Sequence, residues 1–466
     1  MRGLGAVALG ALGVAFCASA QAMGEPGAYI EAAVVPAETR ITKTEPPVGG
    51  AVVRWKAARG EREPALVVVR SSSDALLTAR ASALVSRSGA VIPASAVQLS
   101  QVTWVFRDGE ELPDLLEPWS APVPARPGEN VLVWVEVAVP RGAAPGTYHG
   151  ELSLQSAGAS RELPIELQVL PFALPRKPGL ATSFGVGARS GAVGPFARAA
   201  LRERVTLRVV DPPPFWVTPL EGTLHLDFSA FDRGLGLLLD DASTRPSSIE
   251  IAVPASVPLP RKLEYLLAVK RHLAARGCAD LLVNFGEEGT LLGGVQGPGD
   301  LPGIALVALG GDAPRAAPFW WRVGQSANAR TRVGALDSDA SLSLARGEWL
   351  AENAPGARVR SLGWAAFQAG AVGLYTQEPL ALLYEAEDGT PRESVRLKLL
   401  RQGLEDYDLL QVAAKVDPAQ AHAIAASVLG ADGGPASRTP DFEAARARLL
   451  SVATSHHSSA RMLHLR

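Results

Sequence analysis

Residues 130–139, with the sequence NVLVWVEVAV, place a valine at every second position from Val131 to Val139. Successive side chains of a β-strand point to opposite faces of a sheet, so this period of two predicts a strand that buries one face. Similar short patterns occur in PALVVVRSS (64–72), GTYHGELSLQ (146–155) and ELPIELQVL (162–170). Short strands of this kind with turn signals between them predict an antiparallel β-sandwich over residues 28–172.

A different rhythm follows the proline-rich stretch PFALPRKPG (171–179), which predicts a stiff linker. The patterns beyond it alternate between strand and helix: a strand at 204–210, a helix at 228–241, a strand at 247–254, a helix at 260–277 and a strand at 279–285. Strands and helices in series are typical of a parallel sheet or barrel. We therefore expect a (β/α)8-like barrel, complete or shortened, over residues 176–400. A helical C-terminal segment is expected over residues 401–466.

The first 22 residues have the pattern of a secretory signal peptide. Arg2 supplies a positive charge, residues 4–18 are small and apolar, and Ala20-Gln21-Ala22 forms a cleavage site. A lipid anchor on Cys17 is the alternative, but Phe16 fits poorly where lipidation needs a small residue. The sequence therefore predicts export to the periplasm or the extracellular space, with cleavage after Ala22.

Composition excludes several classes of partner and site. The formal net charge of −2 argues against nucleic acid or an anionic membrane as the main partner, and no later segment is apolar enough to span a bilayer. Removal of the first 22 residues leaves Cys278 as the sole thiol, which excludes an intrachain disulfide. The seven histidines show no metal-ligand spacing. We therefore predict neither a metal site nor a cofactor.

The stretch LLVNFGEEGTLL (281–292) is the main candidate for chemistry. Its apolar run ends at Phe285, and Gly286 is followed by the acidic pair Glu287 and Glu288. Catalytic groups of barrel enzymes lie at the carboxyl ends of the strands, which is where this pair falls in the predicted barrel. The alternative is a solvated turn, which is the commoner role of adjacent acidic residues in a loop.

Several separated stretches together resemble the bacterial family that contains glycoside hydrolase family 123, also described as domain of unknown function 4091. They occur in the family's order: AARGERE (57–63), ELPDLLEPW (111–119), VWVEVAVPRGAAPGTYHGELSL (133–154), LPIELQVLPFALP (163–175), LHLDFSAFD (224–232), FWWRVG (319–324), RSLGWAAFQAGAVGLY (360–375) and GTPRESVRLKLLRQGLEDYDLL (389–410). The set covers most of the chain beyond the signal. The resemblance implies a β-sandwich, a barrel and a helical tail.

The resemblance also implies a reaction, the substrate-assisted cleavage of 2-acetamido-2-deoxy-β-glycosides. The acetamido oxygen of the sugar attacks the anomeric carbon, so the protein supplies one carboxylate to orient the acetamide and one acid to protonate the leaving oxygen. By position, Glu287 stands where the family has aspartate and Glu288 where it has the acid. Glu287 is one methylene longer than aspartate, and Gly289 replaces the family's proline. The implied partner is a carbohydrate or glycoconjugate.

Four further residues are candidates for substrate binding. Trp320 and Trp321 could stack on a sugar ring, with core packing as the alternative. Arg360 could reach a pocket, with a structural salt bridge as the alternative. Tyr375 stands where the family has the first of two aromatic residues, and Thr376 replaces the second. Trp364, among small apolar residues, is expected in the core.

The long helix predicted over residues 391–416 carries the strongest resemblance, and we predict an architectural role for it. Its residues Val395, Leu399, Gly403 and Tyr407 lie four apart on one face. The charged residues Glu393, Arg396, Glu405 and Asp406 are expected to cap the helix or to bridge to the barrel. Two function classes follow from the sequence: an exported glycoside hydrolase, or a catalytically inactive relative that serves as a glycan-binding or envelope-associated scaffold.

Overall fold

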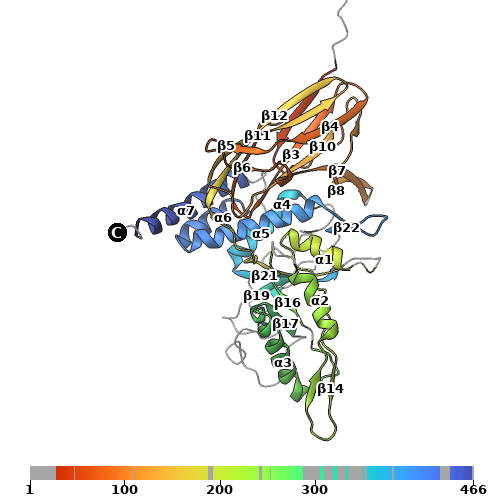
Figure 1. Ribbon diagram of the computed structural model, residues 1–466, viewed down its shortest axis with the longest axis vertical. Coiled ribbons are helices and arrows are strands. Elements are labelled where there is room, and N and C mark those ends of the chain that lie inside the picture. Colours follow the sequence, from red (N-terminus) through yellow and green to blue (C-terminus); the bar gives the residue numbers. More distant parts are fainter. Residues whose placement is uncertain are drawn as a thin grey trace, which may run out of the picture.

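The molecule is built from a sandwich of strands at one end, a layer of helices across the middle and a second group of strands and helices at the other end (Figure 1). The computed structural model describes residues 28–463 except 47, 108, 187–190, 192, 241–243, 252, 287–304, 309–318, 323–331, 334–349, 351–353, 380–381 and 431–440. The paired glutamates Glu287 and Glu288 therefore lie outside the described residues.

The N-terminal part consists of two β-sheets, and the prediction of antiparallel sheets is confirmed. The first sheet is antiparallel throughout and has the order β1 (Ile30–Val35), β3 (Arg62–Ser71), β10 (Val131–Ala138), β7 (Val97–Arg107), β8 (Glu110–Pro118). The second has the order β2 (Val53–Arg59), β12 (Ala159–Ala173), β11 (Gly146–Ser156), β4 (Ala75–Ala81), β9 (Val123–Ala125), with β5 (Leu84–Ser86) paired to β11 and β6 (Val91–Ile92) paired to β5. One pair departs from the prediction, because β2 runs parallel to β12.

Strand β10 buries both of its faces, although its alternation predicted one. The valines from Val131 to Val139 lie in the core between the two sheets, as the pattern indicates. Leu132 and Trp134 point the other way and lie in a second core, which includes residues of the C-terminal helices. The outer face of the first sheet is thus covered by helices, so the sandwich and the rest of the chain share a core.

The second group of strands forms a mixed, half-barrel arrangement. In one sheet the order is β13 (Ala181–Gly185), β21 (Ala371–Pro379), β19 (Phe319–Arg322), β20 (Arg332–Val333), with only β20 antiparallel to its neighbour. The other contains β16 (Ile249–Glu250), β17 (Leu282–Gly286) and β18 (Ala305–Ala308), all parallel. The strand predicted at 204–210 forms a single parallel bridge, between Phe184 and Leu207.

Buried hydroxyl groups connect the two sheets where regular strand pairing is missing. Thr206 N donates to Thr182 Oγ1 at 2.7 Å, Ser247 N donates to Thr206 Oγ1 at 2.9 Å, and Thr182 N donates to Ser247 Oγ at 2.9 Å. A buried backbone N–H needs an acceptor, and here side-chain oxygens supply it. This closed set of three bonds explains why residues 204–210 stay beside β13 without forming a full strand.

Helices cover the half-barrel on its outside and continue into the C-terminal part. They are α1 (Val193–Arg202), α2 (Ser229–Leu239), α3 (Lys262–Ala275), α4 (Gly356–Ala369), α5 (Val395–Ala414), α6 (Pro418–Ser427) and α7 (Phe442–Leu463). Short 3-10 turns lie at Ala94–Ala96, Leu259–Arg261 and Ala279–Leu281, and two hairpins are formed by β14 (Phe215–Val217) with β15 (Leu224–Leu226) and by β22 (Leu383–Glu385) with β23 (Pro391–Glu393). Among the helices that the structure describes, none combines the length and apolar character needed to cross a bilayer.

Helix α5 begins four residues later than the sequence pattern predicted. Pro391 to Glu393 form β23, and Ser394 caps the helix by accepting a hydrogen bond from Leu397 N at 3.0 Å. Figure 1 shows α4 and α5 lying between the sandwich and the parallel strands. Helix α5 therefore contacts both the sandwich and the half-barrel.

The crossing of α4 and α5 depends on two glycines. A Cβ atom at Gly363 would overlap the carbonyl oxygen of Gly403, and one at Gly403 would lie 2.5 Å from the carbonyl oxygen of Arg360. Backbone therefore meets backbone here, and no side chain can move aside. This is why Gly403 occupies the packed face of the predicted helix.

Gly363→Ala should destabilise the protein by about 1–3 kcal/mol, because it forces two packed helices apart. Gly236→Ala is the matched control, since its Cβ would have no neighbour closer than 3.8 Å within α2. That change should be neutral or stabilise by up to about 1 kcal/mol through helix propensity. Urea unfolding of both variants measures the difference, and equal midpoints would contradict the close crossing.

Candidate functional site

The carboxyl ends of the parallel strands lie at one edge of the half-barrel, and the predicted catalytic pair belongs to this edge by sequence. Strand β17 extends to Gly286, so Glu287 and Glu288 follow its carboxyl end directly, although they lie outside the described residues. Strand β19 contains Trp320 and Trp321, whose backbones pair with β21 and β20. The side chains of both tryptophans also lie outside the described part, so their stacking role stays a prediction.

A polar cluster of four side chains lies across neighbouring strands of the half-barrel, and it includes Tyr375. Ser183 on β13 is opposite Tyr375 on β21, and it donates a short hydrogen bond to Glu250 Oε2 on β16. Arg208 Nη1 donates to Tyr375 Oη at 2.9 Å and lies 3.5 Å from Glu250 Oε1. The guanidinium carbon of Arg208 is also 4.9 Å from the Tyr375 ring centroid. Ser183 and Arg208 therefore both contact the carboxyl group of Glu250, and Tyr375 contacts Arg208.

The cluster borders a cavity of about 200 Å³ that is lined by Ser183, Arg208, Leu238, Glu250 and neighbouring backbone. Glu250 and Arg208 keep 13% and 23% of their side chains exposed, so ligands can reach both. Tyr375 is only 5% exposed and makes its polar contact through Arg208. The charged groups of the cluster that remain partly exposed are thus Glu250 and Arg208, whereas Tyr375 is buried.

The carboxyl group of Glu250 is the titratable centre of this cluster. Burial raises its pKa, and the opposing effects of Arg208 and of the Ser183 hydrogen bond do not cancel that rise. A half-buried carboxyl with a raised pKa can accept hydrogen bonds from sugar hydroxyls or exchange a proton with a ligand. Sequence reasoning missed Glu250, although a single carboxylate inside the apolar run SSIEIAV was a signal for it.

Arg360 lies away from this cluster, at the junction of α4, α5 and α7. Its side chain is 1% exposed and pairs with Asp406 at 3.1 Å, Glu443 at 3.1 Å and Glu38 at 3.6 Å. Its guanidinium carbon also lies 4.8 Å from the ring centroid of Phe442. The structure thus places Arg360 in the salt-bridge role that was the alternative to substrate binding. Trp364 is fully buried beside it, as expected.

The charges of α5 bridge both to the sandwich and to the segment after α1, whereas the sequence indicated only capping of the helix or bridging to the barrel. Arg401 Nη1 lies 2.7 Å from Glu136 Oε2 on β10 and 2.9 Å from Glu203 Oε2, just after α1. Lys398 Nζ lies 3.3 Å and 3.0 Å from the same two glutamates. Burial raises the pKa of Glu136, but Arg401 and Lys398 outweigh it and hold that pKa below its usual range. These ions form an architectural core, which is the role predicted for the helix.

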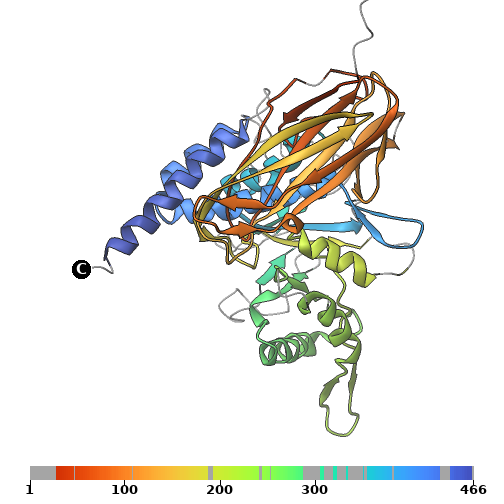
Figure 2. The ribbon, with the colours of Figure 1, turned by 45° about the horizontal axis from the view of Figure 1, so that its top comes forward.

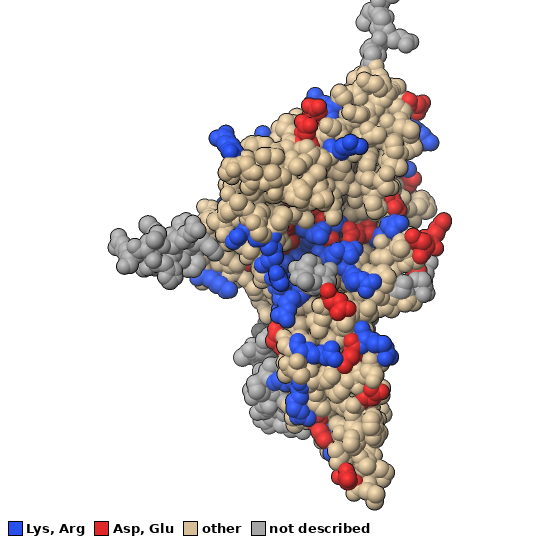
Figure 3. Space-filling model, in the orientation of Figure 1, with Lys and Arg blue, Asp and Glu red and all other residues tan. Residues whose placement is uncertain are grey.

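A second set of buried ions joins α7 to the sandwich. Arg446 lies 2.6 Å from Glu61, 2.5 Å from Glu63 and 2.7 Å from Asp406 of α5. Near it, burial and the charge of Glu61 raise the pKa of Glu405 to about 8 against the opposing effect of Arg401. In Figure 3 the lysine and arginine side chains that reach the surface gather at the middle of the molecule, between the sandwich and the opposite end.

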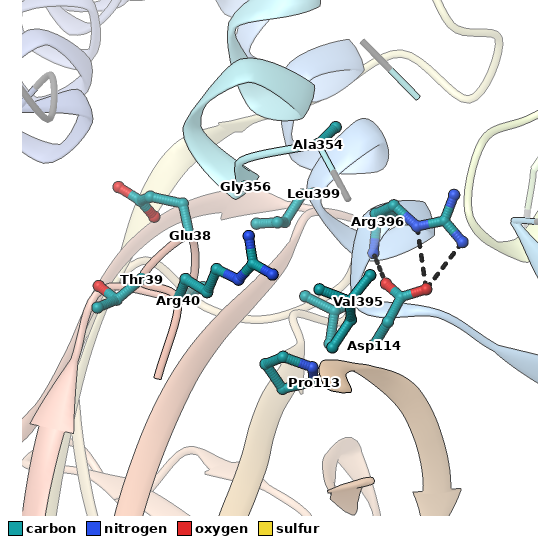
Figure 4. Close-up of a pocket in the computed structure, with 12 residues that line it drawn as sticks. Glu38, Thr39, Arg40, Pro113, Asp114, Ala354, Gly356, Val395, Arg396 and Leu399 are labelled. Carbon is teal, nitrogen blue, oxygen red and sulfur yellow. Dashed lines mark hydrogen bonds and ion pairs between the residues drawn. The ribbon is translucent and has the colours of Figure 1, made fainter. Parts of the chain in front are cut away.

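A cavity of about 440 Å³ lies between the sandwich and the N-termini of α4 and α5, and Figure 4 shows its lining. The charges around it already have partners. Asp114 accepts hydrogen bonds from Arg396 N, Nε and Nη2 at 3.2, 2.9 and 2.8 Å, and Arg40 pairs with Glu110 at 3.1 Å. Because these groups hold the two halves together, we assign this cavity to the junction and not to catalysis. Within the described part of the chain, no group of three acidic, histidine or cysteine side chains could hold a metal ion.

The architecture of an antiparallel β-sandwich followed by a half-barrel and C-terminal helices defines a two-part fold. This fold is shared with a glycoside hydrolase of family 123 from Clostridium perfringens, whose structural analysis addressed glycolipid glycan hydrolysis. The likeness has a TM-score of 0.57 at 13% identity and covers 93% of this chain and 99% of that chain. The resemblance found in the sequence is therefore confirmed at the level of the fold.

Two further solved structures match only a part of the chain. The CooA pilin subunit of enterotoxigenic Escherichia coli has a TM-score of 0.18 at 14% identity, over 30% of this chain and 99% of its own. The SrpA adhesin of Streptococcus sanguinis has a TM-score of 0.18 at 14% identity, over 41% and 91%. No protein-family model and no curated protein matches the sequence.

Proposed function

We propose that the chain is a retaining glycoside hydrolase that acts on 2-acetamido-2-deoxy-β-glycosides. The observation that carries this proposal is the likeness of fold to a family 123 glycoside hydrolase over 93% of the chain. We further propose that the parallel strands belong to a (β/α)8-like barrel that is complete or shortened. Its substrate would be a glycan or glycoconjugate, and the glycolipid glycans named for the Clostridium enzyme are the first class to test.

In this proposal the acetamido oxygen of the substrate attacks the anomeric carbon while Glu288 gives its proton to the leaving oxygen. Glu287 accepts a hydrogen bond from the acetamide N–H and so orients the internal nucleophile. Water then opens the cyclic intermediate, and Glu288 takes back a proton. The position of the pair directly after β17 supports these roles, since barrel enzymes place their catalytic groups at that end of a strand.

We assign a binding role to the described cluster of the half-barrel. Glu250 would accept hydrogen bonds from sugar hydroxyls, and Arg208 would donate them to ring or hydroxyl oxygens. Tyr375 would hold Arg208 in place, because it is nearly buried and its hydroxyl already accepts from that guanidinium. This arrangement supports a substrate-binding role because polar groups that converge from several strands are typical of a small-molecule site.

The purified protein should cleave aryl 2-acetamido-2-deoxy-β-galactosides or -glucosides and leave the matching 2-hydroxy glycosides intact. The 2-hydroxy sugars lack the internal nucleophile, so the reaction has no first step. Release of the aryl alcohol, followed by absorbance, measures both rates. Equal turnover of the two sugars would contradict substrate assistance.

Glu287→Asp separates the hydrolase from the inactive scaffold. The change restores the residue that the family carries, so a catalytic Glu287 should gain activity when the carboxylate reaches its usual place. A turn residue should show no change. If neither protein turns over any acetamido glycoside while glycan binding persists, the scaffold function is the correct one.

A further inference from the structure

The hairpin formed by β14 and β15 stands at the carboxyl face of the half-barrel. It follows the segment that bridges to β13 at Leu207 and precedes α2, so it is a connection from the end of a strand to the start of a helix. In barrel-type folds such connections line the face where ligands bind. Figures 1 and 2 both show the hairpin projecting from the end of the molecule that lies opposite the sandwich.

One face of the hairpin is fastened to α3. Phe215 packs edge-on against Tyr265, with ring centroids 6.2 Å apart, and the Tyr265 hydroxyl donates to Pro213 O at 2.7 Å. At the turn, Arg261 donates a short hydrogen bond to Gly222 O. The base of the hairpin thus contacts Tyr265 and its turn contacts Arg261, so these contacts fix the position of the hairpin against α3.

The opposite face carries Trp216, because neighbouring residues of a strand point to opposite sides. The indole is 54% exposed and lies opposite His225 in the hairpin register. The two rings are stacked, with centroids 5.3 Å apart and an angle of 13° between their planes. His225 is itself fixed by a contact of 2.7 Å between Nε2 and Thr218 Oγ1. One face of the indole is thus covered by a fixed ring, and the exposed area belongs to its edges and its other face.

We propose that Trp216 is a stacking platform for a pyranose ring of an extended glycan, at a position beyond the sugar that is cleaved. A flat, immobilised indole with one free face offers apolar contact at little entropic cost, which suits the C–H face of a sugar. The proposal rests on the proposed function for the identity of the glycan. The platform itself rests on the geometry of the hairpin.

The surroundings favour a neutral sugar over a membrane surface. The exposed turn carries Leu220, 97% exposed, together with the acidic Glu221. On the face seen in Figure 3, this end of the molecule carries scattered acidic and basic side chains, whereas the basic ones gather at the middle of the molecule. Membrane surfaces with anionic lipids are held by clusters of lysine and arginine, and that face shows no such cluster at this end.

The test compares a short substrate with a long one. The wild-type chain and Trp216→Ala are assayed on an aryl 2-acetamido-2-deoxy-β-glycoside and on tetrasaccharides ending in 2-acetamido-2-deoxy-β-galactose or -glucose. We expect the substitution to lower kcat/KM on a tetrasaccharide about 10-fold, mostly through KM, and to leave the aryl substrate unchanged. Trp216→Phe should recover part of the loss. Leu220→Ala is the control, since it removes an even more exposed apolar side chain that lies outside the stack.

The outcomes separate the platform from the proposed function. Equal loss on both substrates would show that Trp216 only supports the fold, and unchanged tetrasaccharide kinetics would overturn the platform. If no sugar is hydrolysed, the proposed function fails, and calorimetric titration of the same tetrasaccharides into the full chain tests the platform alone. Binding that Trp216→Ala weakens supports it, and absent binding overturns it. A loss caused by Leu220→Ala instead, with binding to lecithin vesicles or self-association in sedimentation, would assign the turn to a lipid or a second copy.

Discussion

Glu288→Gln should lower kcat on acetamido glycosides by about 10²- to 10⁴-fold, the usual contribution of general acid catalysis. The amide has the shape of the carboxyl but cannot give a proton to the leaving oxygen. The loss should be smaller for nitrophenyl glycosides than for alkyl glycosides, because a good leaving group needs little protonation. Steady-state kinetics with both kinds of substrate measure this difference.

The control for this variant is the same substitution at Glu264, a half-exposed glutamate of α3 that pairs with Arg261 at 2.6 Å. Glu264→Gln should leave kcat unchanged. A loss at Glu288 that is identical for all leaving groups would remove the acid role, and it would assign the pair to binding or to the turn.

Arg401→Met should destabilise the protein by about 3–5 kcal/mol, the typical result of breaking a buried ion pair from one side. The methionine fills part of the space, but Glu136 and Glu203 lose the cation that lies 2.7 and 2.9 Å from them. Arg54→Met is the matched control, because its pair with Glu166 spans 4.0 Å at 71% and 48% exposure. That pair should contribute at most about 1 kcal/mol. Denaturant unfolding at pH 7 compares the two.

The direction in which the stability changes with pH follows from the pKa shifts of Glu136 and Glu203. Burial raises the pKa of Glu136 and of Glu203, but the cations prevail and hold both pKa values below the ordinary range. Stability from groups of this kind is present above the pKa of the unfolded state and is lost as the pH falls through the folded pKa. The gap in unfolding free energy between wild type and Arg401→Met should therefore narrow as the pH falls below about 5, where these glutamates begin to take up protons in the unfolded chain. A gap that widens in acid would contradict this assignment.

Local patterns in the sequence were enough to predict β3, β10, β11 and β12 of the sandwich, because alternation such as that of β10 is a property of adjacent residues. They could not predict that β2 would run parallel to β12, since strand partners are chosen by the whole fold. The start of α5 was also misplaced, because Pro391 to Glu393 pair with β22 before Ser394 caps the helix. Tertiary pairing decided each of these differences.

The candidate site was predictable only where its reactive residues are adjacent in the sequence. Glu287 and Glu288 stand side by side and were found for that reason. Ser183, Arg208 and Glu250 come together from positions up to 67 residues apart, and nothing local in Arg208 indicates that it will face a carboxyl group. For Arg360 the sequence left a pocket role and a structural ion pair open, and only its partners Glu38, Asp406 and Glu443 assign it to the ion pair.

The charged helix α5 has a consequence for how chains of this fold are recognised. Its side chains meet Glu136 of the sandwich, Glu203 after α1 and Arg446 of α7 at once, so a substitution in any of them leaves an ion stranded in the interior. A chain of this fold therefore needs these ions in order to fold, whatever the chemistry of its half-barrel. A sequence search that relies on α5 therefore finds proteins that share the fold. The residues that follow β17 must then be compared to identify the enzymes among them.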